Sequence, residues 1–118
     1  MKIIQNYLPI SKRRSGLKNL GIKFLVAHDT GNPNSTAKGN VEHYIKTANE
    51  MEASAHIFID DKNIIECIPL DEKAWHVRYL RPEDNERFGV EANDSAIGIE
   101  LCYGKNINNL KAYKNYCK

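Results

Sequence analysis

The sequence has no apolar run long enough to cross a membrane. Its longest apolar stretches are only a few residues, whereas a spanning helix needs about 20. The segment from Met1 to Pro9 also lacks the apolar core of a secretory signal peptide. These absences exclude a transmembrane helix and predict a chain that is made in the cytoplasm without a signal peptide.

Cysteines and excess charge are scarce as well. Cys67, Cys102 and Cys117 do not form a disulfide framework or a Cys-x-x-Cys metal pair, so we expect reduced thiols, the first two buried in strands. The net charge of +2, from 17 basic and 15 acidic residues, is too small to indicate nucleic acid. The one basic cluster, Lys12 to Arg14, is more typical of a solvated loop than of a binding site, although it would also suit an anionic polymer.

What remains is an ordinary globular composition: 118 residues, 42% hydrophobic and 27% charged, without a repeat. This is enough for one domain, residues 1–118, with a modest core. Strand-like apolar runs extend from Ile22 to His28 and from Ile97 to Leu101. Two further β-rich runs, Ser54 to Asp60 and Asn63 to Ile68, are joined by a short polar connection and predict a β-hairpin.

Apolar residues recur at helical spacing in two places. The sets are Val41, Tyr44, Ile45 and Ala48, and then Leu110, Tyr113 and Cys117. The first set predicts a helix with Asn40 as its N-cap, and the second predicts the first turns of a helix from Asn108 to Lys118. The charged segment from Arg78 to Asn93 shows neither period, so we interpret it as a long loop, a common place for substrate contacts.

Two polar side chains stand at the ends of the strand-like runs. Glu100 lies between Ile99 and Leu101, and burying a carboxylate there is costly unless a metal, cation or donor offsets it. The alternative is an edge strand that points Glu100 into water. His28 ends its own strand before a turn-rich loop, where a side chain can reach a cleft; a metal ligand and a hydrogen-bonded structural histidine are both open.

The other histidines carry weaker signals. His43 lies off the apolar stripe of its helix and is most simply a surface residue. His56 shares a strand face with Phe58, so it either lines the cleft or packs in the core. Trp75 and His76 precede the long loop and could form a wall for a sugar or peptide, although a tryptophan is more often a core residue.

Four motifs occur in the order seen in the type-2 N-acetylmuramoyl-L-alanine amidases, and the chain resembles the phage and prophage endolysins of bacilli. The motifs are Val26-Ala-His-Asp-Thr-Gly31, Ser54-Ala-His-Ile-Phe-Ile-Asp-Asp61, Ala74-Trp-His76 and Ser95-Ala-Ile-Gly-Ile-Glu-Leu-Cys102. The resemblance covers about Lys23 to Gly104. It implies an α/β fold with a mixed central β-sheet flanked by α-helices, shared with peptidoglycan recognition proteins and phage T7 lysozyme.

The resemblance also implies a chemistry, the zinc-dependent hydrolysis of the amide between N-acetylmuramic acid and L-alanine in peptidoglycan. By position, His28 matches the first zinc ligand and Glu100 the catalytic acid/base. His56, Trp75 and His76 match recurrent positions around the cleft and are expected to contact substrate. The partner is then bacterial peptidoglycan, reached only after the protein is released from the cell.

The chain departs from the family pattern after Glu100, because only Leu101 to Lys118 remain. The family's second and third zinc ligands follow the next helix, so we expect the remaining ligands of the one Zn²⁺ ion beyond Lys118 and interpret the domain as C-terminally incomplete. An alternative function is therefore a non-catalytic peptidoglycan-binding module. A less supported alternative is a site that combines the histidines with Glu100 or Cys102. The surface left by the missing segment predicts a homodimer.

Overall fold

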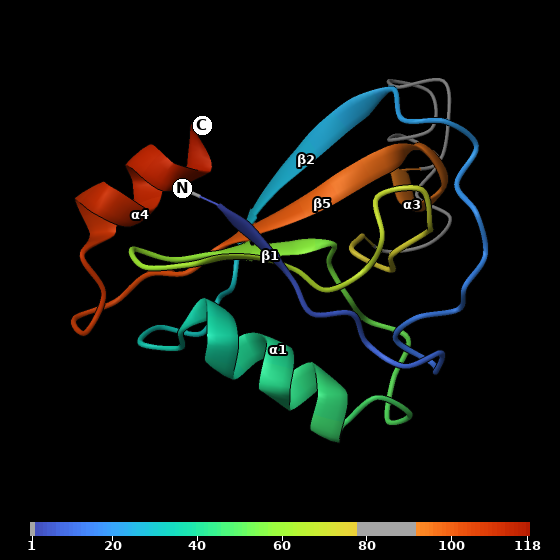
Figure 1. Cartoon of the computed structure of the whole chain (residues 1–118), viewed down its shortest axis with the longest axis horizontal. Coiled ribbons are helices and arrows are strands. Elements are labelled where there is room, and N and C mark those ends of the chain that lie inside the picture. Colours follow the sequence, from blue (N-terminus) through green and yellow to red (C-terminus); the bar gives the residue numbers. More distant parts are fainter. Residues whose placement is uncertain (1, 78–91) are drawn as a thin grey trace.

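A computed structural model describes residues 2–77 and 92–118 of the chain. Within this part, five strands form one sheet in the order β1-β4-β3-β5-β2 (Figure 1). The strands are β1 (Ile3–Gln5), β2 (Phe24–Asp29), β3 (Ile57–Ile59), β4 (Ile64–Glu66) and β5 (Ala96–Leu101). Only β3 and β4 pair antiparallel, so the sheet is mixed, as predicted.

The predicted hairpin and the two predicted strands are present, because their apolar runs pack against one another in the sheet. β3 and β4 form the hairpin, with Phe58 opposite Ile65. β2 and β5 pair in parallel over their whole length. β1, a three-residue strand that pairs with the distant β4, was not predicted from the sequence.

Three helices accompany the sheet in the described ranges: α1 (Ala37–Lys46), α3 (Ala92–Ser95) and α4 (Asn109–Tyr116). The helix predicted around Val41 is α1, but its N-cap is Thr36, whose side chain accepts a hydrogen bond from the backbone N–H of Gly39. The prediction of Asn40 was wrong, because the helix begins one turn earlier. The C-terminal helix is confirmed as α4, capped by Asn108.

The segment predicted as a long loop, Arg78 to Asn93, lies mostly outside the described residues. Its described end was predicted wrongly, because Ala92 and Asn93 begin the short helix α3. Both residues are buried, so the polar composition of the segment does not make its end a surface loop.

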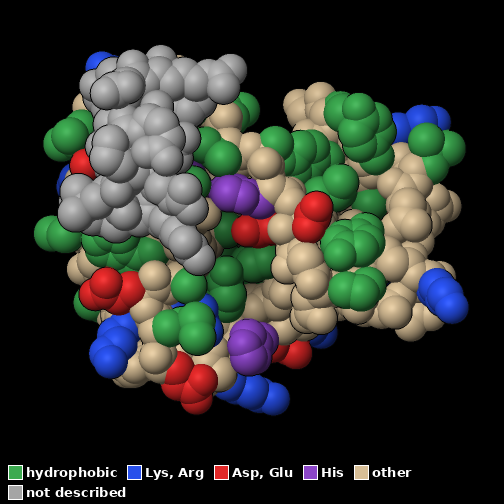
Figure 2. Space-filling view, turned by 180° about the vertical axis from the view of Figure 1, so that it is seen from behind, with side chains coloured by type: hydrophobic (Ala, Val, Ile, Leu, Met, Phe, Trp, Pro, Cys, Tyr) green, Lys and Arg blue, Asp and Glu red, His purple; other side chains and the backbone are tan. Residues whose placement is uncertain are grey.

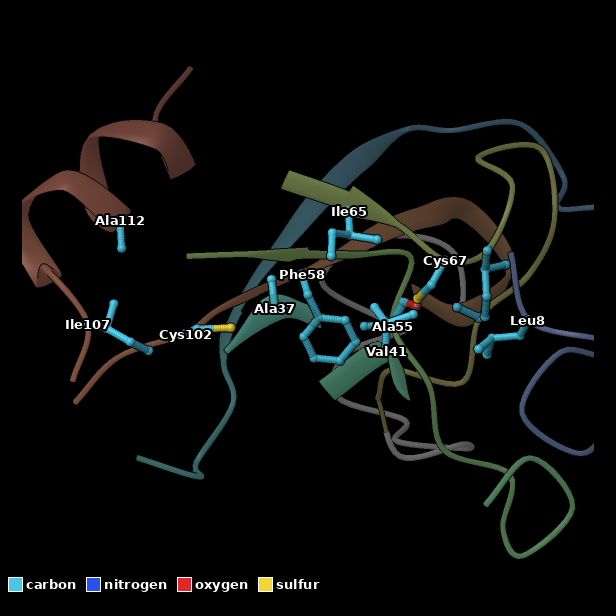
Figure 3. Packing of buried hydrophobic residues seen from close by; sticks show 12 residues of the cluster. Leu8, Ala37, Val41, Ala55, Phe58, Ile65, Cys67, Cys102, Ile107 and Ala112 are labelled. Atoms are coloured by element: carbon cyan, nitrogen blue, oxygen red, sulfur yellow. Dashed lines mark hydrogen bonds between the residues drawn. The ribbon is translucent and has the colours of Figure 1, made fainter. Parts of the chain in front are cut away.

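The main core lies between α1 and the sheet. Figure 3 shows Phe58 and Ile65 extending from the sheet among residues of α1 and the surrounding segments. A second cluster, around Ile57, Ile59 and Ile64, lies on the opposite face, where Tyr116 of α4 packs against it. Figure 1 shows α1 along one side of the sheet and α4 near the end at which β5 finishes.

The basic cluster from Lys12 to Arg14 is solvated only in part: Lys12 is exposed, but the interpretation as a solvated loop was wrong for Arg13. The side chain of Arg13 is buried, donates hydrogen bonds to the carbonyls of Thr47 and Ala53, and lies over the ring of Tyr44. Its guanidinium therefore satisfies carbonyl groups after the end of α1.

All three thiols are free and Cys67 and Cys102 are buried, as predicted. Their predicted place within strands was wrong, because Cys67 directly follows β4 and Cys102 directly follows β5. No helix in the described ranges has the length and apolar character needed to span a membrane.

Candidate active site

The parallel register of β2 and β5 brings His28 and Glu100 together. The two residues are direct partners in the pairing, so both side chains leave the sheet on the same face. Phe58 of β3 is the next partner of Glu100 on that face, and it belongs to the core beneath α1. The histidine and the carboxylate predicted from separate strand ends therefore form one site beside the main core.

Glu100 is half-buried and carries an unsatisfied oxygen. Its Oε2 atom is buried, and no hydrogen-bond partner for it is found among the described residues. Burial, followed by the nearby charge of Asp29, raises the pKa of Glu100 to about 7. A carboxyl group with this pKa can both accept and return a proton near neutral pH.

His28 is in contact with a second histidine. Its Nε2 atom lies 3.4 Å from Nδ1 of His76, and the two rings meet edge to face with centroids 5.6 Å apart. Burial lowers the pKa of His28, against the opposing influence of Asp29. Burial and then the neighbouring rings of His56 and His28 lower the pKa of His76 to about 4. Both imidazoles are therefore neutral at physiological pH.

His56 lies behind this pair and is fully buried. Its Nδ1 atom accepts a hydrogen bond from the backbone N–H of Gly98 at 3.1 Å, and its Nε2 atom lies 2.8 Å from the carbonyl oxygen of Glu72. A carbonyl only accepts, so Nε2 carries the proton of a neutral ring. The described contacts thus occupy both nitrogens of His56, and its predicted contact with substrate stays a prediction.

Trp75 and His43 are placed more simply. Trp75 is half-buried, and the ammonium group of Lys73 lies 4.9 Å from its ring centroid. Its carbonyl accepts a hydrogen bond from the backbone N–H of Ser54, and its own backbone N–H donates to the hydroxyl of Ser54. His43 is exposed on α1, as its position off the apolar stripe predicted. Figure 2 shows one histidine beside acidic side chains near the middle of one face, and a second histidine apart from them.

Two residues of the site were not identified from the sequence. Gly98 of β5 lies under the ring of His76, and any side chain there would overlap that ring. Asn93 of α3 is buried, and its side chain binds the backbone of His76 and Val77. Gly98 stands in an apolar run and Asn93 in a polar one, so neither pattern marked them out.

The described residues do not by themselves complete a zinc site. No group of three or more His, Cys, Asp or Glu side chains able to hold a metal occurs in residues 2–77 and 92–118. His28 fits one ligand position, because Nε2 faces His76 and no described residue forms a hydrogen bond with Nδ1. A catalytic zinc requires about three protein ligands, so His28 supplies one of them at most.

Comparisons with known proteins give the family of the chain. The model of the N-acetylmuramoyl-L-alanine amidase family matches residues 18–116. The amidase BlyA of Bacillus subtilis is 39% identical over 115 residues, and the amidase CwlA of the same organism is 32% identical over 108 residues. Each alignment covers 89% of this chain but only 31% and 35% of the relative, so the chain spans about a third of these proteins.

Solved structures show the same fold. The catalytic domain of XlyA superimposes with a TM-score of 0.79 at 25% identity, covering 98% of this chain and 71% of that one. The mixed sheet with flanking helices is therefore the fold of an amidase catalytic domain, of which this chain spans a part.

Proposed function

Because the chain belongs to the N-acetylmuramoyl-L-alanine amidase family, we propose that it hydrolyses the amide between N-acetylmuramic acid and L-alanine in peptidoglycan. The observation that carries this proposal is the pairing of His28 with Glu100 on one face of the sheet. A half-buried carboxyl group with a pKa of about 7 is suited to amide hydrolysis, in which a proton must be taken from water and given to the leaving amine.

Glu100 is the proposed catalytic acid/base. Its Oε2 atom is buried and has no hydrogen-bond partner among the described residues, which is costly for a carboxylate and is typical of a functional group. The carboxylate accepts a proton from the attacking water and then gives it to the nitrogen of L-alanine as the amide bond breaks. The same oxygen can serve both steps because its pKa lies near the working pH.

Zinc is the proposed cofactor, with His28 as one ligand and the other ligands outside the described residues. The chemistry that zinc supplies to such hydrolases is a lower pKa of bound water and a polarised carbonyl. Trp75 and His76 are proposed to border the substrate, and His56 to support them from behind. The proposed partner is cell-wall peptidoglycan, which the protein reaches after its release from the cell.

A second function is favoured by a specific observation. The described residues hold no group of three metal-ligating side chains, and the chain spans about a third of its curated relatives. The 118-residue chain would then be a peptidoglycan-binding module that does not cleave.

The two functions are separated by comparing two proteins on purified peptidoglycan: residues 1–118, and residues 1–118 followed by the remaining segment of the XlyA catalytic domain. We expect the extended protein to release new amino termini of L-alanine and to stop when a chelator removes zinc. Glu100→Gln should lower its rate about 10²- to 10⁴-fold, the usual contribution of general acid–base catalysis.

The matched control is His43→Gln, which replaces an exposed histidine of α1 and should leave the rate unchanged. Release of reducing sugar ends instead of amino termini would contradict the amidase proposal, as would cleavage that persists without metal. Binding of the extended protein to peptidoglycan without any cleavage would favour the binding module.

A further inference from the structure

We propose that His76 is a positioning residue, which holds the imidazole of His28 in place and determines which of its nitrogens carries the proton. The contact between the two rings lies within residues 1–118. The assignment of the proton to one nitrogen of His28 rests on the proposed function, in which His28 is a metal ligand.

The contact between the two rings limits which nitrogen of each ring can carry the proton. A neutral imidazole has one protonated nitrogen and one bare nitrogen, so at the 3.4 Å contact one ring must donate and the other accept. If Nε2 of His28 donates to Nδ1 of His76, Nδ1 of His28 keeps its lone pair. If Nδ1 of His76 donates instead, Nε2 of His28 is the acceptor and has no proton. The proton of His28 is then on Nδ1, which cannot bind a metal. We therefore assign the proton to Nε2 of His28.

His76 can act in this way because its ring is closely packed against the chain. On one side the ring lies against Gly98, where even a methyl group would overlap its atoms. Gly98 belongs to β5, two residues before Glu100, so the strand that carries the carboxylate also supports His76. The absence of a side chain at Gly98 lets the imidazole lie close to the strand.

The backbone of His76 is also fixed. The side-chain oxygen of Asn93 accepts hydrogen bonds from the N–H groups of His76 and Val77, at 2.9 and 3.1 Å, and its amide group donates to the carbonyl of Val77 at 3.1 Å. Asn93 is only 1% exposed, so these bonds are shielded from water. The segment is thereby attached to α3, which leads directly into β5.

A third histidine closes the arrangement from behind. The ring centroid of His56 lies 5.9 Å from that of His76, and both of its nitrogens are held by backbone groups. The three rings are therefore arranged in space in the order His56, His76, His28, from the buried interior toward the site. The interior end is fixed by the backbone, so a rotation of His76 is resisted on that side.

This inference is tested by nitrogen-15 NMR of the histidine rings in residues 1–118, with a chelator present and near neutral pH. Two-bond proton–nitrogen correlations distinguish a protonated from a bare ring nitrogen. We expect His28 to show Nε2 protonated and Nδ1 bare, without averaging. In His76→Phe, which keeps a ring over Gly98 but removes the acceptor, the two nitrogen shifts of His28 should move toward each other as both tautomers become populated.

The conservative variant is His76→Asn, whose side-chain oxygen can occupy the position of Nδ1 and should restore the single tautomer. His43→Phe is the matched control, because it replaces an exposed histidine of α1, and it should leave His28 unchanged. A backbone amide spectrum verifies that each variant is folded. If His76→Phe does not fold, His76→Ala replaces it in the comparison with His76→Asn.

Two results would overturn the inference: a parent chain with Nδ1 of His28 protonated, or a folded variant lacking the acceptor in which His28 keeps a single tautomer. The measurement uses neither metal nor substrate. If the extended protein does not hydrolyse peptidoglycan but the tautomer depends on His76, only the proposed function fails. If hydrolysis occurs while the tautomer is independent of His76, only the positioning fails.

Discussion

Burial of Glu100 has a consequence for stability. Its pKa in the folded chain is about 7, compared with an ordinary value of 4.5. The folded state therefore holds the proton more tightly than the unfolded state. The resulting stability is fully present below about pH 4.5 and is lost as the pH rises through about 7. Above that range, the ionised carboxylate is a net cost to the fold.

We predict that Glu100→Gln stabilises the metal-free chain near pH 8, because it removes a charge that is partly desolvated. The raised pKa of Glu100 corresponds to a difference of about 3 kcal/mol in the free energy of unfolding. We reduce this to about 1–2 kcal/mol because the side chain is partly exposed to solvent. Urea unfolding in the presence of chelator measures the difference, which should disappear near pH 4. Glu42→Gln, at an exposed position of α1, is the control. An equal gain at both pH values would contradict the explanation.

Gly98 provides a second residue-level prediction. A Cβ atom at this position would overlap the ring of His76, so Gly98→Ala should displace the ring and destabilise the fold by about 1–3 kcal/mol, as overpacking usually does. Thermal or urea unfolding measures the loss. The cause is tested by repeating the substitution in His76→Ala, where the overlap is absent and the cost of Gly98→Ala should fall. Full additivity of the two changes would rule out the overlap as the cause.

Among the secondary-structure elements, the hairpin, α1 and α4 are linked through one buried residue. Asp60 is 2% exposed and follows β3. Its side chain accepts hydrogen bonds from the N–H groups of Ala37, Lys62 and Asn63, and its backbone carbonyl accepts one from Asn115 of α4. The carboxylate therefore lies at the start of α1, where the helix dipole also favours a negative charge.

We predict that Asp60→Ala destabilises the chain by about 2–4 kcal/mol, because it leaves three N–H groups without their acceptor, two of them at the turn of the hairpin. Hydrogen exchange should show the earliest loss of protection at the start of α1 and in the β3–β4 turn. The matched control is Asp71→Ala, which removes an aspartate whose ion pair with Lys18 is exposed, and its effect should be much smaller. Equal effects of the two substitutions would show that charge, not hydrogen bonding, is responsible.

The elements that could be predicted from the sequence are those with a local pattern. β2 and β5 have continuous apolar runs, and the hairpin connects neighbouring segments, so periodicity and turn chemistry were sufficient. β1 could not be predicted, because its partner β4 lies about sixty residues later and short exposed strands carry little signal. The burial of Arg13 depends on carbonyl groups after α1, which a charge pattern does not reveal.

The same distinction applies to the candidate site. His28 and Glu100 were found because each interrupts or ends an apolar strand, and the parallel register then placed them side by side. The roles of Gly98 and Asn93 depend on contacts across the sheet and with a short helix, which only the folded chain brings together. His56 was identified, but the occupation of both its nitrogens could not be predicted from its strand position.

For the molecule as a whole, the apolar stripe of α4 is an exposed apolar surface outside the site. The spacing of Leu110, Tyr113 and Cys117 predicted the helix, but these side chains are turned toward solvent, with Leu110 64% and Tyr113 57% exposed. The helix instead packs through Ala112 and Asn115. An apolar stripe on an exposed helix promotes association, because contact with another apolar surface removes it from water.

We therefore predict that residues 1–118 self-associate as their concentration rises, in reducing buffer that prevents disulfides through the exposed Cys117. Sedimentation equilibrium should show an average mass that increases toward a dimer. Leu110→Lys should weaken this association at least several-fold, because a charge in the stripe would have to be desolvated. Asn106→Lys adds the same charge at an exposed polar position before α4 and is the matched control. A monomer at every concentration would refute the prediction, and an equal effect of both lysines would indicate net charge rather than the stripe as the cause.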